Sequence, residues 1–338
     1  MITRSAVLTA PGALKFEEVE LPDGELDAAN IRADTEYSAI SIGTELAAYR
    51  GDPPLRPGST YPRLVGYCNV ARVSEVGRQV SEIRPGDQIL THQSHRGAFI
   101  CPANTVLATV PVGVESPDAS MAQFAYLGLR AVRRAATKPG DIVLVLGLGL
   151  IGLATVAIAK KSGASVIAFG NDNERLQKAI ELGSDIAVDS SDSDQMARFC
   201  ETFGKTGPDV LITTANPWEA WRDVLEMSAH GSRIVVVGFP GRSEGAPTLN
   251  PFMSEHFYDK DLSVHALGPE PDFRVTQTPT PASVRQDMEQ ILSWIEDGNL
   301  PLGALITDTF QWRELSVAYD RAATGDKSLI GAVLDWRD

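Results

Sequence analysis

"VLGLGLIGLATVAIAKKSGASVIAFGND", residues 145–172, contains the pattern that decides the fold of this chain. An apolar run leads into Gly147, Gly149 and Gly152, and a segment with helical spacing and a second apolar run follow. The spacing G-x-G-x-x-G at such a strand–helix junction predicts a dinucleotide-binding turn, whereas an ordinary glycine-rich turn is the alternative. The predicted pyrophosphate site, at the positive end of the helix dipole, is the backbone of Gly147, Leu148, Gly149, Leu150, Ile151 and Gly152.

The end of the second strand carries the residues that distinguish NAD from NADP. An acidic residue there normally holds the adenosine ribose, but in this chain the position is Gly170. Glycine removes the anion that would repel a 2′-phosphate, and Asn171 and Arg175 can hold such a phosphate. Asp172 acts in the opposite direction, because it can bind the ribose hydroxyls or repel phosphate. The stretch slightly favours NADP over NAD.

Short apolar runs alternate with helical segments on both sides of this turn. The alternation predicts an α/β fold with a doubly wound parallel sheet, the Rossmann arrangement, from about residue 123 to 267. The predicted strands are 141–147, 165–170, 185–190, 208–215, 232–239 and 262–268, and the predicted helices are 153–163, 173–183, 194–204 and 217–231.

The flanking parts of the chain have a different texture. Residues 1 to about 120 consist of short alternating runs divided by glycine and proline, a pattern typical of antiparallel strands. Examples of predicted strands are 12–21, 30–40, 66–77 and 86–92. After residue 267 the sequence predicts a proline-rich loop at 268–283, helices at 284–300 and 314–325, and a strand at 329–336.

The bulk properties exclude several classes of partner. A net charge of −14 argues against nucleic acid or an anionic membrane as a main partner. The three cysteines, Cys68, Cys101 and Cys200, are too few and too scattered for a disulfide framework and favour a reducing compartment. No apolar run approaches the roughly 20 residues of a membrane span, and the N-terminus has no signal-peptide pattern. We expect a cytoplasmic protein with a small-molecule substrate.

Several longer blocks carry a family resemblance. They are "SIGTELAAYRG" (41–51), "YPRLVGYCNVARVSEVG" (61–77), "RPGDQIL" (84–90), "KPGDIVLVLGLGLIGL" (138–153) and "DMEQILSWIEDGNLPLGALITDTF" (287–310). In these blocks, over nearly its whole length, the chain resembles the medium-chain dehydrogenase/reductase superfamily, the alcohol dehydrogenase-like proteins. The resemblance implies a split, mainly β, GroES-like catalytic domain (1–122 and 268–338), a Rossmann cofactor-binding domain (123–267) and an active site in the cleft between them. It also implies a homodimer paired through the sheet edge at 262–268.

The family's zinc ligands have no counterparts in this sequence. In zinc-dependent members a cysteine precedes the block that reads "GTE" here, but this chain has Ile42. The histidine of their second block corresponds to Tyr67, and the third ligand would fall in 121–128, which holds neither cysteine nor histidine. Because a catalytic zinc needs about three protein ligands, we predict no metal. The chain looks like a zinc-free branch, similar to bacteriochlorophyllide dehydrogenase-type proteins and to polyol or cyclitol dehydrogenase homologues.

Two residues become the main candidates for the chemistry. Without zinc, hydrogen-bond donors must polarise the substrate oxygen. Thr44 matches the family's hydroxyl residue of the proton relay, and the alternative is a turn threonine that caps the following helix. Tyr67 is the best replacement acid, since a phenol near a cationic nicotinamide can act as general acid and base. Its alternative is a tyrosine that only lines the pocket.

Three further candidates lie nearby in the sequence. Glu45 either orients a neighbour or simply occupies the first turn of a helix, where acidic residues are favoured. His92 and His95, in "THQSHRG", follow a predicted strand end, where a histidine can relay protons. The alternative for both is a histidine on a surface loop.

The remaining candidates follow from the resemblance. Ile42, Gln123 and Tyr126 are expected to line the substrate side. The nicotinamide carboxamide is expected to meet backbone groups after the later strands, at Val237, Gly238, Ala266, Leu267 and Gly268.

The leading functional hypothesis is a zinc-independent, NAD(P)-dependent oxidoreductase that interconverts a secondary alcohol and a ketone on a polar or bulky metabolite, such as a polyol, cyclitol or sugar. One alternative within the same class is an NAD(P)H-dependent enone or quinone reductase. An alternative from another class is a non-catalytic NAD(P)H-binding sensor or structural protein.

Overall fold

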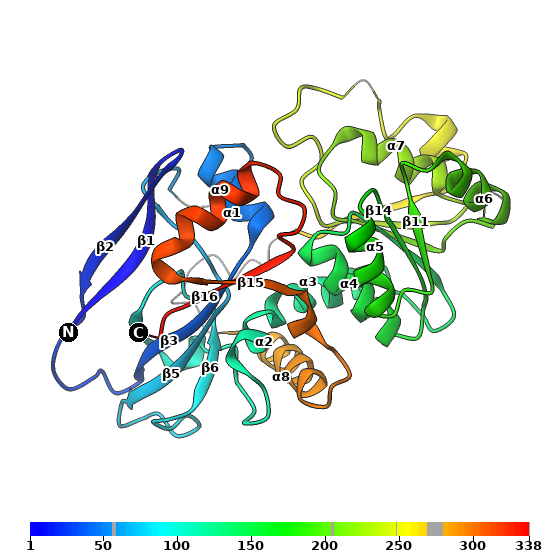
Figure 1. Ribbon diagram of the computed structural model, residues 1–338. Helices are drawn as coiled ribbons and strands as arrows, with labels where there is room; N and C mark the ends of the chain where they lie inside the picture. The colour runs from blue at the N-terminus through cyan, green and yellow to red at the C-terminus, as the bar shows by residue number, and fades with distance from the viewer. Residues whose placement is uncertain (56–58, 204–205, 248, 269–279, 338) are drawn as a thin grey trace. The chain divides into compact units, whose positions relative to one another are not determined.

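The chain forms two compact units. The computed structural model describes residues 1–55, 59–203, 206–247, 249–268 and 280–337, so most of the proline-rich stretch at 268–283 lies outside the described residues. Unit 1 comprises Met1–Gln123 with Pro269–Asp338, and unit 2 comprises Phe124–Gly268. In Figure 1 the colour ramp shows both chain ends contributing to unit 1.

Unit 2 is built on a six-stranded parallel sheet with the strand order β11-β10-β9-β12-β13-β14. The neighbours of the central strand β9 are β10 and β12, so the sheet reverses its winding at β9, where ligands bind in doubly wound folds. The strands are β9 (Ile142–Leu146), β10 (Ser165–Gly170), β11 (Ile186–Asp189), β12 (Val210–Thr213), β13 (Arg233–Val236) and β14 (Ser263–Ala266).

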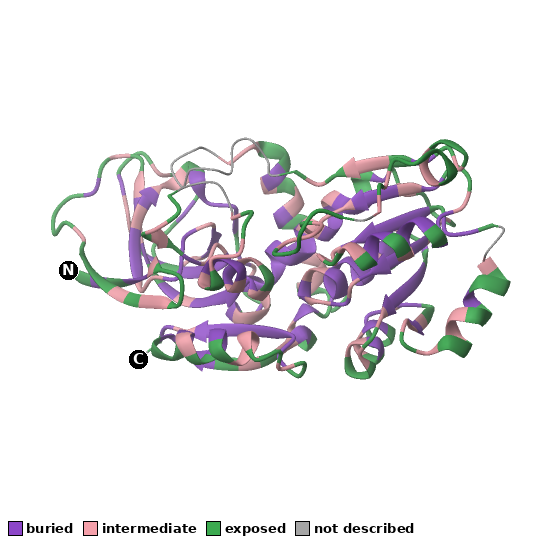
Figure 2. Cartoon of the chain, turned by 90° about the horizontal axis from the view of Figure 1, so that it is seen from above, coloured by how far each residue is buried: buried purple, intermediate pink, exposed green. Residues whose placement is uncertain are grey.

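The helices of unit 2 differ in how much of their surface is apolar. Helix α4 (Leu150–Lys161) is buried at nearly every position up to Ala159, as its continuous apolar sequence requires. The other helices are α3 (Ala122–Arg134), α5 (Asn173–Glu181), α6 (Ser193–Phe203) and α7 (Trp218–Met227). Helices α5, α6 and α7 keep several polar positions exposed to solvent, and α3 exposes only its last two residues, Arg133 and Arg134. Figure 2 shows exposed residues in green and buried residues in purple along the chain. Helices α4, α5, α6 and α7 contact strands of the parallel sheet, and the strand order with these helices confirms the doubly wound fold.

Unit 1 is mainly β and contains two sheets. The larger sheet has the order β15-β16-β3-β5-β6-β8, with β7 also paired to β3, and the smaller has the order β2-β1-β4. Most neighbours are antiparallel, whereas β15 and β16 run parallel. The strands are β1 (Ile2–Ala10), β2 (Ala13–Glu20), β3 (Asn30–Ile40), β4 (Arg63–Leu64), β5 (Asn69–Val76), β6 (Gln88–Thr91), β7 (Ala98–Pro102), β8 (Ala108–Thr109), β15 (Ile306–Gln311) and β16 (Gly331–Asp335).

Two of the helices of unit 1, at Ile42–Arg50 and Leu315–Ala323, contribute to one of its apolar clusters. Tyr319 is the largest fully buried side chain there, and Trp312 stacks on Trp336 with ring centroids 5.4 Å apart. The helices are α1 (Ile42–Arg50), α2 (Ser116–Ser120), α8 (Ala282–Glu296) and α9 (Leu315–Ala323). Helices α1 and α9, far apart in sequence, lie against each other, as Figure 1 shows.

Some elements differ from the sequence prediction. The strand expected at 66–77 begins only at Asn69, because Gly66 adopts a left-handed backbone with φ of 84°. Tyr67 and Cys68 therefore lie in the connection between β4 and β5. No helix in the described parts of the chain is long and apolar enough to cross a membrane.

Candidate functional site

The glycine turn of unit 2 leaves no room for side chains at two of its three glycines. Gly147 has a φ of 90°, and a β-carbon there would lie 2.8 Å from Thr214 Oγ1. A β-carbon on Gly152 would lie 1.9 Å from the Gly147 carbonyl oxygen, which no real contact allows. The third, Gly149, has only Arg175 Nη1 within 4 Å of its virtual β-carbon, at 3.9 Å. The turn is thus tightly packed at Gly147 and Gly152, whereas the space next to Gly149 is open.

This open side coincides with the start of α4. Gly149 is the N-cap residue and makes no side-chain cap, so the first amide groups of α4 receive no hydrogen bond from a capping side chain. Such amides, together with the helix dipole, bind anions. The backbone of residues 147–152 therefore fits the pyrophosphate of a dinucleotide, with room for the phosphate oxygens over Gly149.

The end of β10 places the candidate ribose-binding residues. Gly170 ends the strand, and Asn171 is exposed. The Asp172 carboxylate caps α5 by accepting a hydrogen bond from the Arg175 amide at 3.1 Å. The Arg175 guanidinium donates to the Leu148 carbonyl oxygen at 3.2 Å, beside the glycine turn. Burial lowers the pKa of Arg175, against the opposing effect of the carboxylates of Asp172 and Glu174.

The later strands end in backbone with little free space. The Val237 amide donates to the Thr213 carbonyl oxygen at 2.9 Å, and a β-carbon on Gly238 would lie 2.7 Å from the Thr214 carbonyl oxygen. The Leu267 amide donates to the Val236 carbonyl oxygen at 2.8 Å. Ala266 ends β14, and the Gly268 carbonyl oxygen accepts from Arg130. We therefore expect these residues to contact a cofactor through their backbone groups and not through polar side chains.

In unit 1 the candidates gather around the start of α1. The N-cap residue is Ser41, not Thr44, which lies inside the first turn and donates its amide to the Ser41 carbonyl oxygen at 3.0 Å. The interpretation of Thr44 as a capping threonine is therefore wrong. Ser41 makes no side-chain cap, although such a cap stabilises a helix by about 0.5–2 kcal/mol. Its Oγ instead lies 2.6 Å from the Tyr67 hydroxyl oxygen.

The Glu45 carboxylate lies directly beneath this pair and is only 3% exposed. Oε1 accepts the Ser41 amide at 2.7 Å, and Oε2 accepts the Tyr319 hydroxyl at 2.6 Å and faces His95 Nε2 at 2.9 Å. Burial by itself raises the pKa of Glu45, but the charge of His95 and these hydrogen bonds outweigh it and lower the pKa below the ordinary carboxyl value. Burial and the Glu45 charge raise the pKa of Tyr319 well above its usual value.

His95 extends the same network into the core. Its side chain has no exposed surface, so the surface-loop interpretation is wrong for this histidine. Nδ1 lies 2.7 Å from Ser38 Oγ, which also accepts the Trp336 indole N–H at 2.8 Å. A β-carbon on Gly66 would lie 2.6 Å from the imidazole ring, so only glycine fits there. His95 and Glu45 thus support the site from below, without access to solvent.

The other candidates lie at various depths. His92 is half-buried, and its Nδ1 lies 3.1 Å from the Tyr67 carbonyl oxygen. Gln123 is buried, with no hydrogen-bond partner for its Oε1 among the described residues, and Tyr126 lies one turn further along α3. Ile42, the first residue of α1, packs against the apolar cluster around Tyr319. Ser41 is the functional candidate that the sequence reasoning did not identify.

The side chains around Tyr67 do not fit a catalytic zinc. The ligand types that zinc prefers in proteins are thiolate, imidazole and carboxylate, whereas the positions in question hold an alkyl group at Ile42 and a phenol at Tyr67. The neighbouring Cys68 is fully buried. Within the described ranges no group of three or more His, Cys, Asp or Glu residues is arranged to hold a metal ion.

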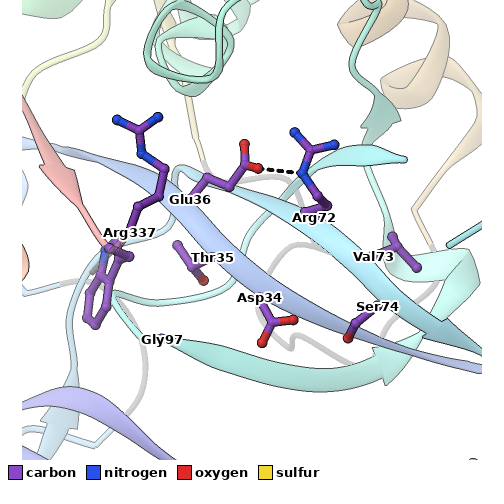
Figure 3. A pocket seen from close by; sticks show the side chains of 9 residues that line it. Asp34, Thr35, Glu36, Arg72, Val73, Ser74, Gly97 and Arg337 are labelled. Atoms are coloured by element: carbon purple, nitrogen blue, oxygen red, sulfur yellow. Dashed lines mark hydrogen bonds and ion pairs between the residues drawn. The ribbon is translucent and has the colours of Figure 1, made fainter. Parts of the chain in front are cut away.

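A cavity of about 500 Å³ opens elsewhere in unit 1, between β3, β5 and the residues that follow β16. Figure 3 shows the Glu36 carboxylate pointing toward the Arg72 guanidinium, with 2.6 Å between Oε1 and Nε. None of the candidate residues lines this cavity, which is formed by Asp34, Thr35, Glu36, Arg72, Val73, Ser74, Gly97, Trp336 and Arg337. We assign it no function.

Comparison with known proteins identifies the class of fold and enzyme. Residues 151–269 match the protein family described as zinc-binding dehydrogenase. Over nearly its whole length the chain is similar to a zinc-type alcohol dehydrogenase-like protein of Escherichia coli, at 22% identity. The relatives over most of its length are named dehydrogenases, and this protein is accordingly an NAD(P)-dependent oxidoreductase.

Relatives of this dehydrogenase span its whole length. Sorbitol dehydrogenase of Halalkalibacterium halodurans is 23% identical, covering 96% of this chain and 97% of the relative. The structure of 2R,3R-butanediol dehydrogenase from Bacillus subtilis has a TM-score of 0.80 at 20% identity, covering 98% and 99% of the two chains. A short chain alcohol dehydrogenase from E. coli CFT073, complexed with NADH, has a TM-score of 0.79 at 21% identity and covers 99% of each chain.

The glycine turn gives a first prediction. Gly152→Ala forces a methyl group against the Gly147 carbonyl oxygen, so we expect a loss of about 1–3 kcal/mol in stability and weaker binding of NADH and NADPH. Thermal unfolding and a titration of nicotinamide fluorescence measure the two effects. Gly245→Ala is the control, because the same unit offers open space there. Unchanged cofactor affinity in Gly152→Ala would contradict the proposed cradle.

The buried carboxylate gives a second prediction. Because the folded-state pKa of Glu45 is lowered, its contribution to stability is present above the ordinary pKa of about 4.3 and is lost as the pH falls through the folded-state value. Glu45→Gln should therefore cost about 1–3 kcal/mol at neutral pH and show a smaller further loss in acid. Denaturant unfolding from neutral to acidic pH measures this, with the exposed Glu17→Gln as control. Parallel acid curves for wild type and Glu45→Gln would refute it.

Proposed function

We propose that this protein is a zinc-independent, NAD(P)-dependent dehydrogenase that interconverts a secondary alcohol and a ketone on a polar metabolite of the polyol or sugar class. The carrying observation is the hydroxyl pair formed by Tyr67 and Ser41, 2.6 Å apart, at the position where the family's zinc ligand would stand. Tyr67 is half-buried, so its phenol can be reached by a substrate while remaining partly shielded from water.

In the proposed chemistry, residues of unit 1 transfer the proton, and unit 2 binds the cofactor. Bound NAD(P)H supplies the hydride that reduces the carbonyl carbon. Tyr67 donates its hydroxyl proton to the carbonyl oxygen as that oxygen becomes the alcohol, and it recovers a proton from solvent. In the oxidative direction Tyr67 accepts the proton of the alcohol. Thr44, in the first turn of α1, is the proposed second hydrogen-bond partner of the substrate oxygen, and unit 2 is the proposed cofactor-binding unit.

The proposed substrate class rests on the names of the relatives and on the residues of the proposed pocket. Relatives include a sorbitol dehydrogenase, and a structure with the same fold is a butanediol dehydrogenase. Sorbitol and butanediol both contain a secondary alcohol group next to at least one further hydroxyl group. Ile42, Gln123 and Tyr126 are the proposed pocket residues, and the unpaired Gln123 Oε1 is a suitable acceptor for a substrate hydroxyl.

Within the cofactor proposal, NADP is slightly favoured over NAD. Gly170 leaves no carboxylate at the strand end, and Asp172 is occupied in capping α5. The Arg175 guanidinium beside the glycine turn provides a cation for a 2′-phosphate. A structure of the same fold is complexed with NADH, so the fold itself is compatible with the other cofactor.

Removal of the phenol hydroxyl tests the proposed acid. Tyr67→Phe should lower kcat by about 10²-fold or more, the usual contribution of a general acid, with little change in the KM for the cofactor. The assay follows NAD(P)H absorbance with sorbitol and 2,3-butanediol. Tyr37→Phe is the matched control, since it removes a phenol hydroxyl that bonds Asp335 instead.

Three outcomes would count against the proposal. Unchanged turnover in Tyr67→Phe would reduce Tyr67 to a wall residue. Turnover of an enone such as 2-cyclohexen-1-one, with none of any polyol, would favour C=C reduction instead. One zinc ion per chain in the purified protein would overturn the zinc-independent assignment.

Cofactor preference gives a further prediction. NADPH should bind more tightly than NADH, and Arg175→Ala should weaken NADPH binding by about tenfold, because it loses a hydrogen bond between charged groups. NADH affinity should change little. Fluorescence titration measures both, with the exposed Arg222→Ala as control. Equal affinity of the wild type for the two cofactors would refute the reading of Gly170 and Arg175.

A further inference from the structure

The Ser41 hydroxyl does not form the capping hydrogen bond that is expected of a serine at the N-cap of a helix. Serine is a preferred N-cap residue because its Oγ accepts an amide of the first helical turn. In α1 this bond is absent, and Oγ lies 2.6 Å from the Tyr67 hydroxyl oxygen instead. A local helix-stabilising contact is thus replaced by a contact across 26 residues of sequence.

The backbone of Ser41 is held in place from the opposite side. Its amide donates to Glu45 Oε1 at 2.7 Å, and the other oxygen of that carboxylate is engaged by His95 and Tyr319. All three of these supporting side chains are at most 3% exposed. Because a dry, fully paired carboxylate cannot easily move, Ser41 is presented to Tyr67 in one position.

We propose that Ser41 is a positioning residue for the reaction: it orients the Tyr67 hydroxyl and stabilises its ionised form, and the Glu45–His95 pair fixes Ser41 for this purpose. This inference rests on the proposed role of Tyr67 as the acid. It adds a residue that neither the family resemblance nor the sequence pattern identifies.

The direction of the effect follows from hydrogen-bond chemistry. A neutral phenol can donate to Ser41 or accept from it, but a phenolate can only accept. Hydrogen bonds to a charged acceptor are about twice as strong as neutral ones, so the Ser41–Tyr67 bond strengthens when Tyr67 ionises. Titratable groups around Tyr67 include His92, which contacts its carbonyl oxygen, and the adjacent Cys68. His95 packs against Gly66, and Glu45 accepts the Ser41 amide. The Ser41 Oγ lies 2.6 Å from the phenol oxygen of Tyr67, within hydrogen-bond distance.

The test distinguishes an effect of the Ser41 hydroxyl on Tyr67 ionisation from a general loss of stability and from the proposed catalytic role of Tyr67. Purified full-length protein carrying tyrosine labelled with ¹³C at Cζ is titrated by NMR without substrate, and comparison with Tyr67→Phe assigns the Tyr67 signal. Ser41→Ala removes the hydroxyl while keeping the amide that binds Glu45, and Ser41→Thr keeps both. Ser120→Ala is the control, because it removes the hydroxyl of another buried serine of unit 1, which bonds the Pro117 carbonyl oxygen.

We expect Ser41→Ala to decrease the acid dissociation constant of Tyr67 by about tenfold and kcat by a similar factor, with the KM for NAD(P)H unchanged. The pH profile of kcat should shift by the same amount, whereas Ser41→Thr and Ser120→Ala should resemble wild type. Combined with Tyr67→Phe, Ser41→Ala should cause no further loss, since it acts through that phenol.

Other results would overturn the inference. An unaltered Tyr67 titration in Ser41→Ala would show that the hydroxyl pair does not couple to ionisation. A double variant whose loss equals the product of the two single losses would show that Ser41 acts independently of Tyr67. Failure of the proposed function looks different: Tyr67→Phe would then retain full turnover, while the NMR titration would still report the Ser41–Tyr67 coupling.

Discussion

A single carboxylate in a dry interior constrains the centre of unit 1. Glu45 remains ionised there because hydrogen-bond donors from three separate parts of the chain, Ser41, His95 and Tyr319, surround it. A buried charge without such partners would cost several kcal/mol. The start of α1, the loop after β6 and helix α9 must therefore meet at one point. The proposed reactive phenol stands one hydrogen bond away from this point.

Much of the fold was readable from the sequence, for a physical reason. The central strands β9, β10 and β12 of unit 2 are buried at most positions, so their sequences are apolar runs. All six observed strands of the sheet lie within their predicted ranges. The glycine turn was equally readable, because its three glycines act within one short segment. In unit 1, strand β1 was not among the strands predicted individually, since Thr3 and Ser5 interrupt its apolar positions while being buried.

The supporting part of the candidate site could not be read in the same way. Tyr67 emerged from a family comparison, but its partner Ser41 is 26 residues away, and no local pattern marks the pair. Glu45 meets His95 across 50 residues and Tyr319 across 274 residues. The stretch "THQSHRG" made His95 a candidate, but nothing in it indicates that the imidazole ring is buried against Gly66. Buried polar networks depend on tertiary geometry, which periodicity does not encode.

The discontinuity of unit 1 has a consequence for how the chain matures during translation. Glu45 leaves the ribosome 274 residues before Tyr319, an interval on the order of tens of seconds at about 5–20 residues per second. Throughout it the carboxylate lacks one of its donors, and Ser38 lacks the indole of Trp336. Residues 124–268 can fold as a unit in that interval, whereas the N-terminal sheets wait with an open apolar face. Unit 1 therefore completes its core only after its C-terminal segment has been synthesised, later than unit 2 can complete its own.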